Sequence, residues 1–134
     1  MIFEAPHALA QLADRVETLI PPTNDDDMTW WQVNSAVWRY VGRPDHPHWH
    51  HAHNGHWWWG EGNGEFRGDR PAPEYLSSWD RACGLILPGW RLVLAGMGSE
   101  WTAGLGAQGR MVGASAPSAP QAIVAAAIRS RTPA

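Results

Sequence analysis

Six of the seven histidines and four of the ten tryptophans of the chain lie between Asp45 and Trp59. Neutral imidazole is a common ligand of zinc, nickel and copper. Indole rings can stack on nucleobases. One short segment therefore concentrates the residues with which this chain could bind a metal or a flat ligand. They are His46, His48, His50, His51, His53 and His56, with Trp49, Trp57, Trp58 and Trp59.

A metal site is one interpretation of this segment. In an extended chain, histidines two residues apart point to the same face, and three nitrogens with a water make an open zinc site. The helical His-Glu-x-x-His spacing is absent, and a solvated loop with locally hydrogen-bonded histidines is the simpler interpretation. We therefore expect no cofactor and keep zinc or another transition metal as an alternative. Its ligands would come from His48, His50, His51, His53 and His56.

Binding of a small ligand is the leading interpretation. The four tryptophans of the segment could stack on an aromatic ring, while Arg67 and Arg70 could donate paired hydrogen bonds to phosphate. An aromatic clamp with a few arginines suits a small nucleotide better than a long nucleic-acid strand. The simpler alternative is that at least two of Trp57, Trp58 and Trp59 pack inside the protein, because alternate residues of a strand face opposite ways.

Composition disfavours several classes of partner. The formal net charge is -3 and no basic run occurs, so we expect no extended nucleic acid. The most apolar stretch, Leu85 to Met97, is interrupted by Pro88 and Arg91, so we expect no membrane span. The chain has one cysteine and does not start with a secretion signal, which together predict a soluble protein in a reducing cytoplasm.

Apolar spacing predicts four helices and three strands. The helices are expected over about 6–19, 24–41 and 79–87, with a last helix from Ser118 or Ala119. Strands are expected near 90–95, 101–105 and 110–114, and the short turns between them imply an antiparallel meander. Cys83 would be a small buried residue of the third helix.

Residues 43–73 lack a helical period and are broken by proline, glycine and asparagine. A connection of this length is uncommon in a compact domain unless it carries function or is disordered. We therefore expect a single domain over 1–134 with a long His- and Trp-rich insertion at about 43–73.

The run from Gly104 to Gly109 matches the glycine pattern of dinucleotide-binding folds, but we do not assign that function. The motif must open a helix, with an acidic residue about 20 positions later. Here a strand is expected to follow, and no Asp or Glu occurs after Glu100. These glycines are expected to turn a hairpin or to leave room beside the sheet.

Segments of the C-terminal half have a recognisable pattern. Tyr75 to Ala82 starts a helix with tyrosine, serine and aspartate, Leu85 to Trp90 holds a leucine-proline-glycine-tryptophan turn, and Ala116 to Arg131 is alanine-rich. This pattern resembles small bacteriophage proteins of the phage ABA-sandwich domain group. The resemblance implies an alpha-beta-alpha sandwich and a small accessory role in the cytoplasm of a bacterial host. It implies no particular reaction.

Together these observations predict an α+β protein with a small antiparallel meander near 90–115, packed by three to four helices. We expect a non-enzymatic, homo-oligomeric phage accessory protein that binds a small host ligand. In the sharpest version it sequesters a nucleotide immune signal. The alternatives are a metal-binding protein or metal-dependent enzyme that uses the histidines, and a structural or protein-interaction module.

Overall fold

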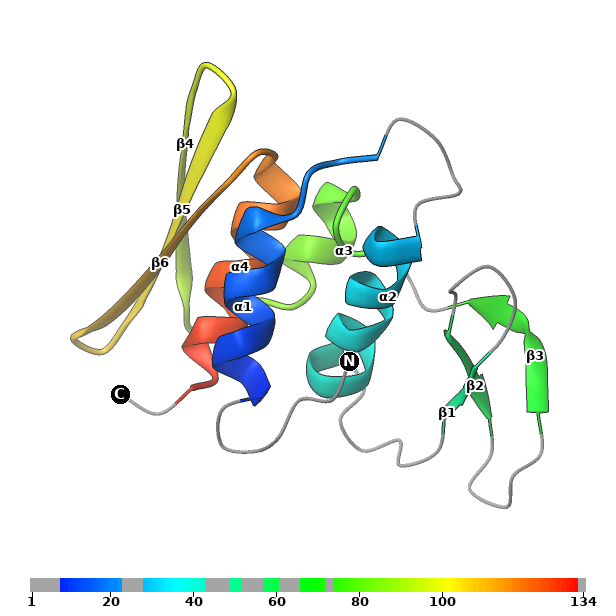
Figure 1. The fold of residues 1–134 in the computed structure, drawn as a ribbon. Helices are drawn as coiled ribbons and strands as arrows, with labels where there is room; N and C mark the ends of the chain where they lie inside the picture. The colour runs from blue at the N-terminus through cyan, green and yellow to red at the C-terminus, as the bar shows by residue number, and fades with distance from the viewer. Residues whose placement is uncertain are drawn as a thin grey trace. The chain divides into compact units, whose positions relative to one another are not determined.

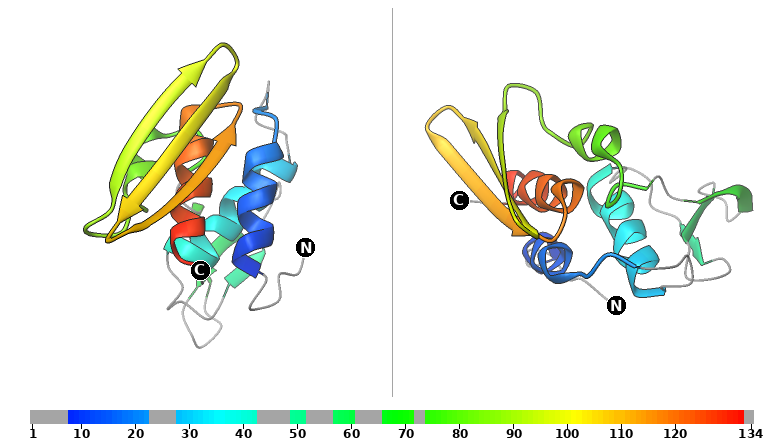
Figure 2. Two further views of the ribbon diagram at one scale, coloured as in Figure 1. Left: turned by 90° about the vertical axis from the view of Figure 1, so that its left-hand side faces the viewer. Right: turned by 90° about the horizontal axis from the view of Figure 1, so that it is seen from above.

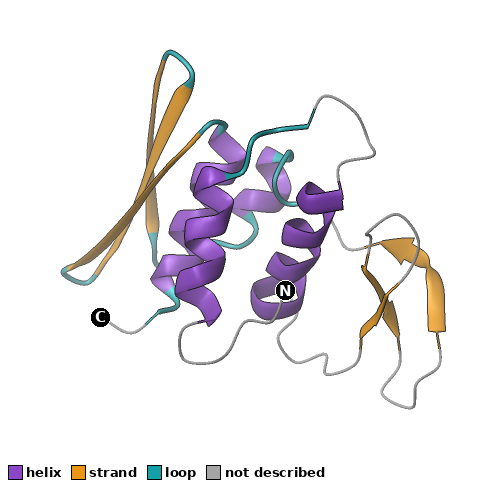
Figure 3. Cartoon of the chain, in the orientation of Figure 1, coloured by secondary structure: helices purple, strands orange, loops and turns teal. Residues whose placement is uncertain are grey.

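The computed structural model describes residues 8–22, 28–42, 49–51, 57–60, 66–71 and 74–132 (Figures 1 and 3). The chain divides into two compact units. The terminal unit is drawn from Met1–Pro21 and Tyr75–Ala134, and the middle unit is Pro22–Glu74. A single domain over 1–134 with an insertion at about 43–73 stays a prediction.

The terminal unit contains an antiparallel sheet in the order β4-β5-β6. Its strands are β4 (Arg91–Met97), β5 (Glu100–Ala107) and β6 (Arg110–Ala116). The pairing is continuous, from Arg91 opposite Gly106 to Met97 opposite Glu100, and from Trp101 opposite Ala116 to Ala107 opposite Arg110. The expected meander is confirmed, although each strand is longer than predicted.

Two-residue turns join the strands. Gly98 has a φ of 63° in the first turn, while Gln108 and Gly109 have φ values of 48° and 79° in the second. Positive φ at the first or at both central residues gives the II′ and I′ turns whose twist matches that of paired strands. Glycine adopts such angles without steric cost, which explains its place in both turns.

Helices cover one face of this sheet. Helix α4 (Ala119–Ser130) packs on β5 and β6, α1 (Ala8–Thr18) lies beside α4 and reaches β6, and α3 (Trp79–Cys83) packs against α4 (Figure 2). The α+β class is thus confirmed. Helix α4 is buried on nearly all sides because its neighbours surround it. The largest fully buried side chains of this unit are Leu12, Val16, Leu76, Leu105, Gln121, Ile123, Val124 and Ile128.

The expected start of the last helix is confirmed: α4 begins at Ala119, the Ser118 hydroxyl accepts a hydrogen bond from the Gln121 amide, and Pro120 lies in the first turn. Helix α3 is capped by Ser78 and begins at Trp79, as expected, but it ends at Cys83 rather than near Leu87. The helix ends where the hydrogen bonding changes: the Gly84 amide still bonds to the oxygen four residues back, whereas the Leu85 and Ile86 amides bond to oxygens three residues back, at Ala82 and Cys83. The expectation for Cys83 was wrong, because this residue ends the short helix and is exposed.

The middle unit begins, in its described part, with α2 (Met28–Val37), which continues as the π-helical turn η1 (Trp38–Gly42). The expected start near Asn24 lies outside the described residues, and the described helical backbone reaches Gly42, one residue beyond the predicted end at about Val41. A second antiparallel sheet follows in the order β1 (Trp49–His51), β2 (Trp57–Gly60) and β3 (Phe66–Pro71). The three consecutive tryptophans, Trp57, Trp58 and Trp59, therefore all lie in β2.

Candidate functional site

The aromatic residues chosen from the sequence lie on paired strands of the middle unit. Trp49 is in β1 opposite Trp59 in β2, and Trp57 is opposite His51. Trp58 also lies in β2, whereas Arg67 and Arg70 lie in β3. The backbone thus brings these residues into one small sheet. The structure does not describe their side chains, so the clamp itself stays a prediction.

The histidine cluster is described only in part. His50 and His51 lie in β1, while His46, His48, His53 and His56 lie outside the described residues. No group of three or more histidine, cysteine, aspartate or glutamate side chains is placed to hold a metal ion within the described part of the chain. Because most of the histidine cluster lies outside the described residues, this finding does not test it, and the metal alternative stays a prediction.

The described side chains reveal a different candidate site, on the face of the terminal sheet that α1 and α4 do not cover (Figure 2, left). We call it the open face. Apolar side chains stand out from it into solvent: Val93 is 70%, Met111 78% and Met97 82% exposed. Apolar exposure of this kind on both outer strands of one sheet face marks an interaction surface more often than an isolated exposed residue does.

A cleft of about 760 Å³ lies over this face. Its floor is β5, where Gly104 and Gly106 replace side chains with bare backbone, and Val93 and Met111 stand beside it on the neighbouring strands. A Cβ added at Gly104 would meet nothing nearer than the Val93 oxygen at 3.9 Å, so the space above this glycine is open. The hollow therefore exists because β5 has no side chains there.

Two arginines line the cleft, and they differ in whether their guanidinium groups are already engaged by other groups of the protein. The Arg110 guanidinium donates to the backbone oxygens of Arg129, Ser130 and Thr132 and lies 5.7 Å from the centre of the Trp90 ring. It therefore caps the negative end of α4. Arg91 is exposed and has no ionic partner among the described residues. Of the two, Arg91 is the cation that an anionic ligand could reach.

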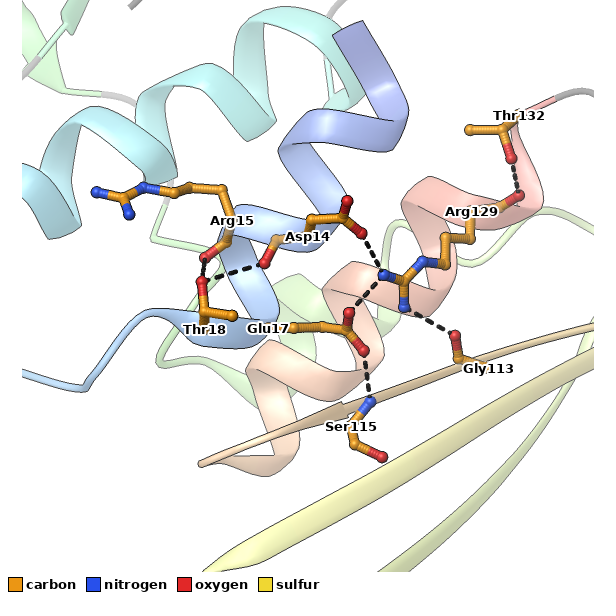
Figure 4. A network of polar contacts seen from close by, with 8 residues as sticks. All are labelled: Asp14, Arg15, Glu17, Thr18, Gly113, Ser115, Arg129 and Thr132. Carbon is orange, nitrogen blue, oxygen red and sulfur yellow. Dashed lines mark hydrogen bonds and ion pairs between the residues drawn. The ribbon is translucent and has the colours of Figure 1, made fainter. Parts of the chain in front are cut away.

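A second polar cluster joins the helices to the sheet (Figure 4). The Arg129 guanidinium binds the carboxylates of Asp14 and Glu17 and donates to the Gly113 oxygen at 3.0 Å. Glu17 also accepts the Ser115 amide at 2.8 Å. The Arg129 hydrogen bond, aided by the Ser115 amide, lowers the pKa of Glu17 despite partial burial. These groups satisfy one another, which makes the cluster structural.

The sequence pattern singled out the glycines that line the cleft, but it did not predict the cleft itself. Gly104 and Gly106 lie in β5 and Gly109 lies in the hairpin turn, so the rejection of a dinucleotide motif is confirmed. Alternation of Val93, Ala95 and Met97 was a signal that β4 has a second apolar face. Periodicity could not tell which face the helices would cover.

Within the described ranges, no helix has both the length and the apolar character that crossing a membrane requires. The chain matches no protein-family model, no curated protein and no solved structure.

Proposed function

We propose that this protein is a non-enzymatic binding protein that holds a small, flat, anionic ligand in the cleft of the open face. The observation that carries the proposal is the glycine floor of the cleft, flanked by apolar side chains and by the Arg91 guanidinium, which has no ionic partner among the described residues. The volume, about 760 Å³, lies within the range of small-molecule sites.

The lining suits an aromatic ring joined to a phosphate. A flat ring can lie against the bare peptide groups of Gly104 and Gly106, with Val93 and the Met111 thioether at its edges. The Arg91 guanidinium can donate two parallel hydrogen bonds to a phosphate group. A nucleotide combines these features.

The residue types of the cleft favour binding over catalysis. Among the described residues that line it, none is aspartate, glutamate, histidine or cysteine. These are the side chains that most often act as general acids, bases or nucleophiles. In the sharper form of the proposal, the protein sequesters a nucleotide signal of a host defence system. That form is supported by the resemblance to small phage proteins together with this lining.

Calorimetric titration with nucleosides, nucleoside phosphates and cyclic nucleotides tests the proposal. Gly104→Val fills the floor without a close contact in the structure and should weaken binding at least about tenfold. Arg91→Gln should weaken the binding of phosphorylated ligands about tenfold while leaving the binding of nucleosides nearly unchanged. Met97→Ser is the matched control, because Met97 is exposed on the same face outside the cleft. Absence of heat across the panel, or equal binding by Gly104→Val, would refute the proposal.

A second candidate site is favoured by the strand pairing of the middle unit, which brings Trp49 opposite Trp59. There the ligand would stack on an indole, with Arg67 or Arg70 for its phosphate. Trp59→Ala and Gly104→Val distinguish the sites, because only the variant at the true site should lose binding in the same titration.

A further inference from the structure

We propose that a second copy of this chain pairs with the free edge of β4, in antiparallel orientation about Leu94, so that two terminal sheets join into one six-stranded sheet. This inference does not depend on the proposed ligand. Edge pairing leaves the open face uncovered, so the cleft would stay accessible in the dimer.

The two edges of the terminal sheet differ in whether side chains occupy their outward-facing backbone groups. On the β6 edge, the Ser115 amide donates to Glu17 and the Gly113 oxygen accepts from Arg129 (Figure 4). Side chains from α1 and α4 thus occupy backbone groups that another strand would need. Proteins block sheet edges in such ways to prevent unwanted pairing.

The β4 edge has no such blocking contact among the described residues. Residues that flank a two-residue turn exchange hydrogen bonds, so Met97 bonds to Glu100 and alternate β4 residues face away from β5. The backbone groups of Leu92, Leu94 and Gly96 therefore point to the outer edge. The same rule assigns Gly113 and Ser115 to the outer edge of β6, where their bonds to Arg129 and Glu17 are found.

The side chains of β4 also lack the features that keep an edge strand single. After Arg91 the strand has no charge and no proline. On one face Val93 and Met97 are exposed, and on the other Leu92 and Leu94 are only half-buried. Helix α4 packs on β5 and β6, which leaves the inner side of β4 partly uncovered.

A second copy fits this edge by symmetry. Pairing about Leu94 sets Leu94 opposite Leu94 of the second copy and Leu92 opposite its Gly96, and each pair exchanges two backbone hydrogen bonds. The large side chain of Leu92 thereby lies opposite Gly96, which has no side chain. The place of the missing Gly96 side chain is already taken by the Trp101 ring, 3.0 Å from where a Cβ would stand. Leu92 of each copy would join this apolar surface of the other.

Charges complement each other in the same register. Arg91 would lie opposite Met97 of the second copy, and Glu100 pairs with Met97 one strand further on the same face. Two strand spacings amount to about 10 Å, a gap that arginine and glutamate side chains span together. Both residues are exposed and lack ionic partners among the described residues. The dimer would form this ion pair twice, and a phosphate in the cleft would compete with Glu100 of the second copy for Arg91.

Sedimentation of the full chain over a range of concentrations, together with amide exchange, tests the proposal. A seven-residue edge is a small interface, so we expect micromolar rather than nanomolar association. Glu100→Arg should raise the dimer dissociation constant about tenfold, and Arg91→Glu should do the same. The double variant should return to within about threefold of the wild type. Exchange of the Leu94 amide should slow as concentration rises, whereas that of Ser115, already bonded to Glu17, should not change.

A chain that stays monomeric at millimolar concentration would overturn the proposal. So would a dimer that the double variant fails to restore, or one whose protection falls on β6 instead of β4. The two proposals fail separately, because Glu100 lies outside the cleft. Glu100→Arg should therefore lose dimerisation and keep ligand binding, while the double variant should regain dimerisation without the affinity for phosphate.

Discussion

Single polar side chains hold the terminal unit together over long sequence distances. Gln121 is fully buried and donates to the Val16 and Leu19 oxygens at 3.1 and 2.6 Å, so it caps the end of α1 from the start of α4. Sequence spacing gave no signal for this role. Arg129 lies in the last turn of α4, but its guanidinium turns to α1 and β6. Local periodicity cannot predict partners about 100 residues away.

Glu17 gives a prediction for stability against pH. Its pKa is lowered in the folded state from an ordinary value of 4.5, chiefly by the Arg129 hydrogen bond. A lowered carboxyl pKa adds stability that is fully present above the unfolded value and is lost as pH falls through the folded value. Glu17→Gln should therefore lower the free energy of unfolding by about 1 kcal/mol near pH 7, since the pair is partly exposed. The difference should vanish at pH values below the folded pKa, as measured by urea denaturation.

Asp14 provides the matched control at this site. It binds the same guanidinium at 2.8 Å, but its side chain is 75% exposed. Near pH 7, Asp14→Asn should change the free energy of unfolding less than Glu17→Gln does. An equal loss in both variants would mean that the Ser115 amide adds nothing to the Glu17 contact.

At the scale of elements, the sequence predicted most of the terminal unit. Apolar spacing in α1 and α4, and short apolar runs between Gly-containing turns, were enough to place helices and strands. The predicted end of α3 was wrong because the helical hydrogen bonding gives way to bonds three residues apart after Cys83, a change that apolar spacing does not reveal. The open face was not predicted. Alternation of residue types shows that a strand has two faces, but it does not show on which face the helices will pack.

The second hairpin turn tests how local conformation contributes to the sheet. Gln108 holds a positive φ of 48°, which is costly for a residue with a side chain, while asparagine tolerates it better. Gln108→Asn should therefore raise the free energy of unfolding by about 0.5 kcal/mol. Gly109→Ala, at a φ of 79°, should lower it by about 1 kcal/mol. Thermal unfolding measures both, and a stabilising effect of Gly109→Ala would contradict this account.

At the scale of the whole molecule, the terminal unit is built from two separated segments of the chain. Helix α1 is joined to α4 and β6 by buried apolar side chains, by Gln121 and by the Arg129 cluster. The sequence showed an amphipathic first helix but not its partner. The separation also means that the covalent link through Pro22–Glu74 is distinct from the contacts that hold α1 in place.

Cleavage of that link should therefore leave the terminal unit assembled. If a protease site is introduced between Pro22 and Tyr75 and cut, the fragment with α1 should co-elute with the rest in gel filtration and separate only in denaturant. Leu12 and Val16 are fully buried, and burial of each large aliphatic side chain contributes about 1.5–3 kcal/mol to keeping α1 bound. Leu12→Ala should make the cut fragments separate, whereas Ile20→Ala, at a residue 77% exposed, should not. Prompt separation of the unmodified fragments would show that α1 depends on its covalent link, and that its packing against α4 is weaker than its burial indicates.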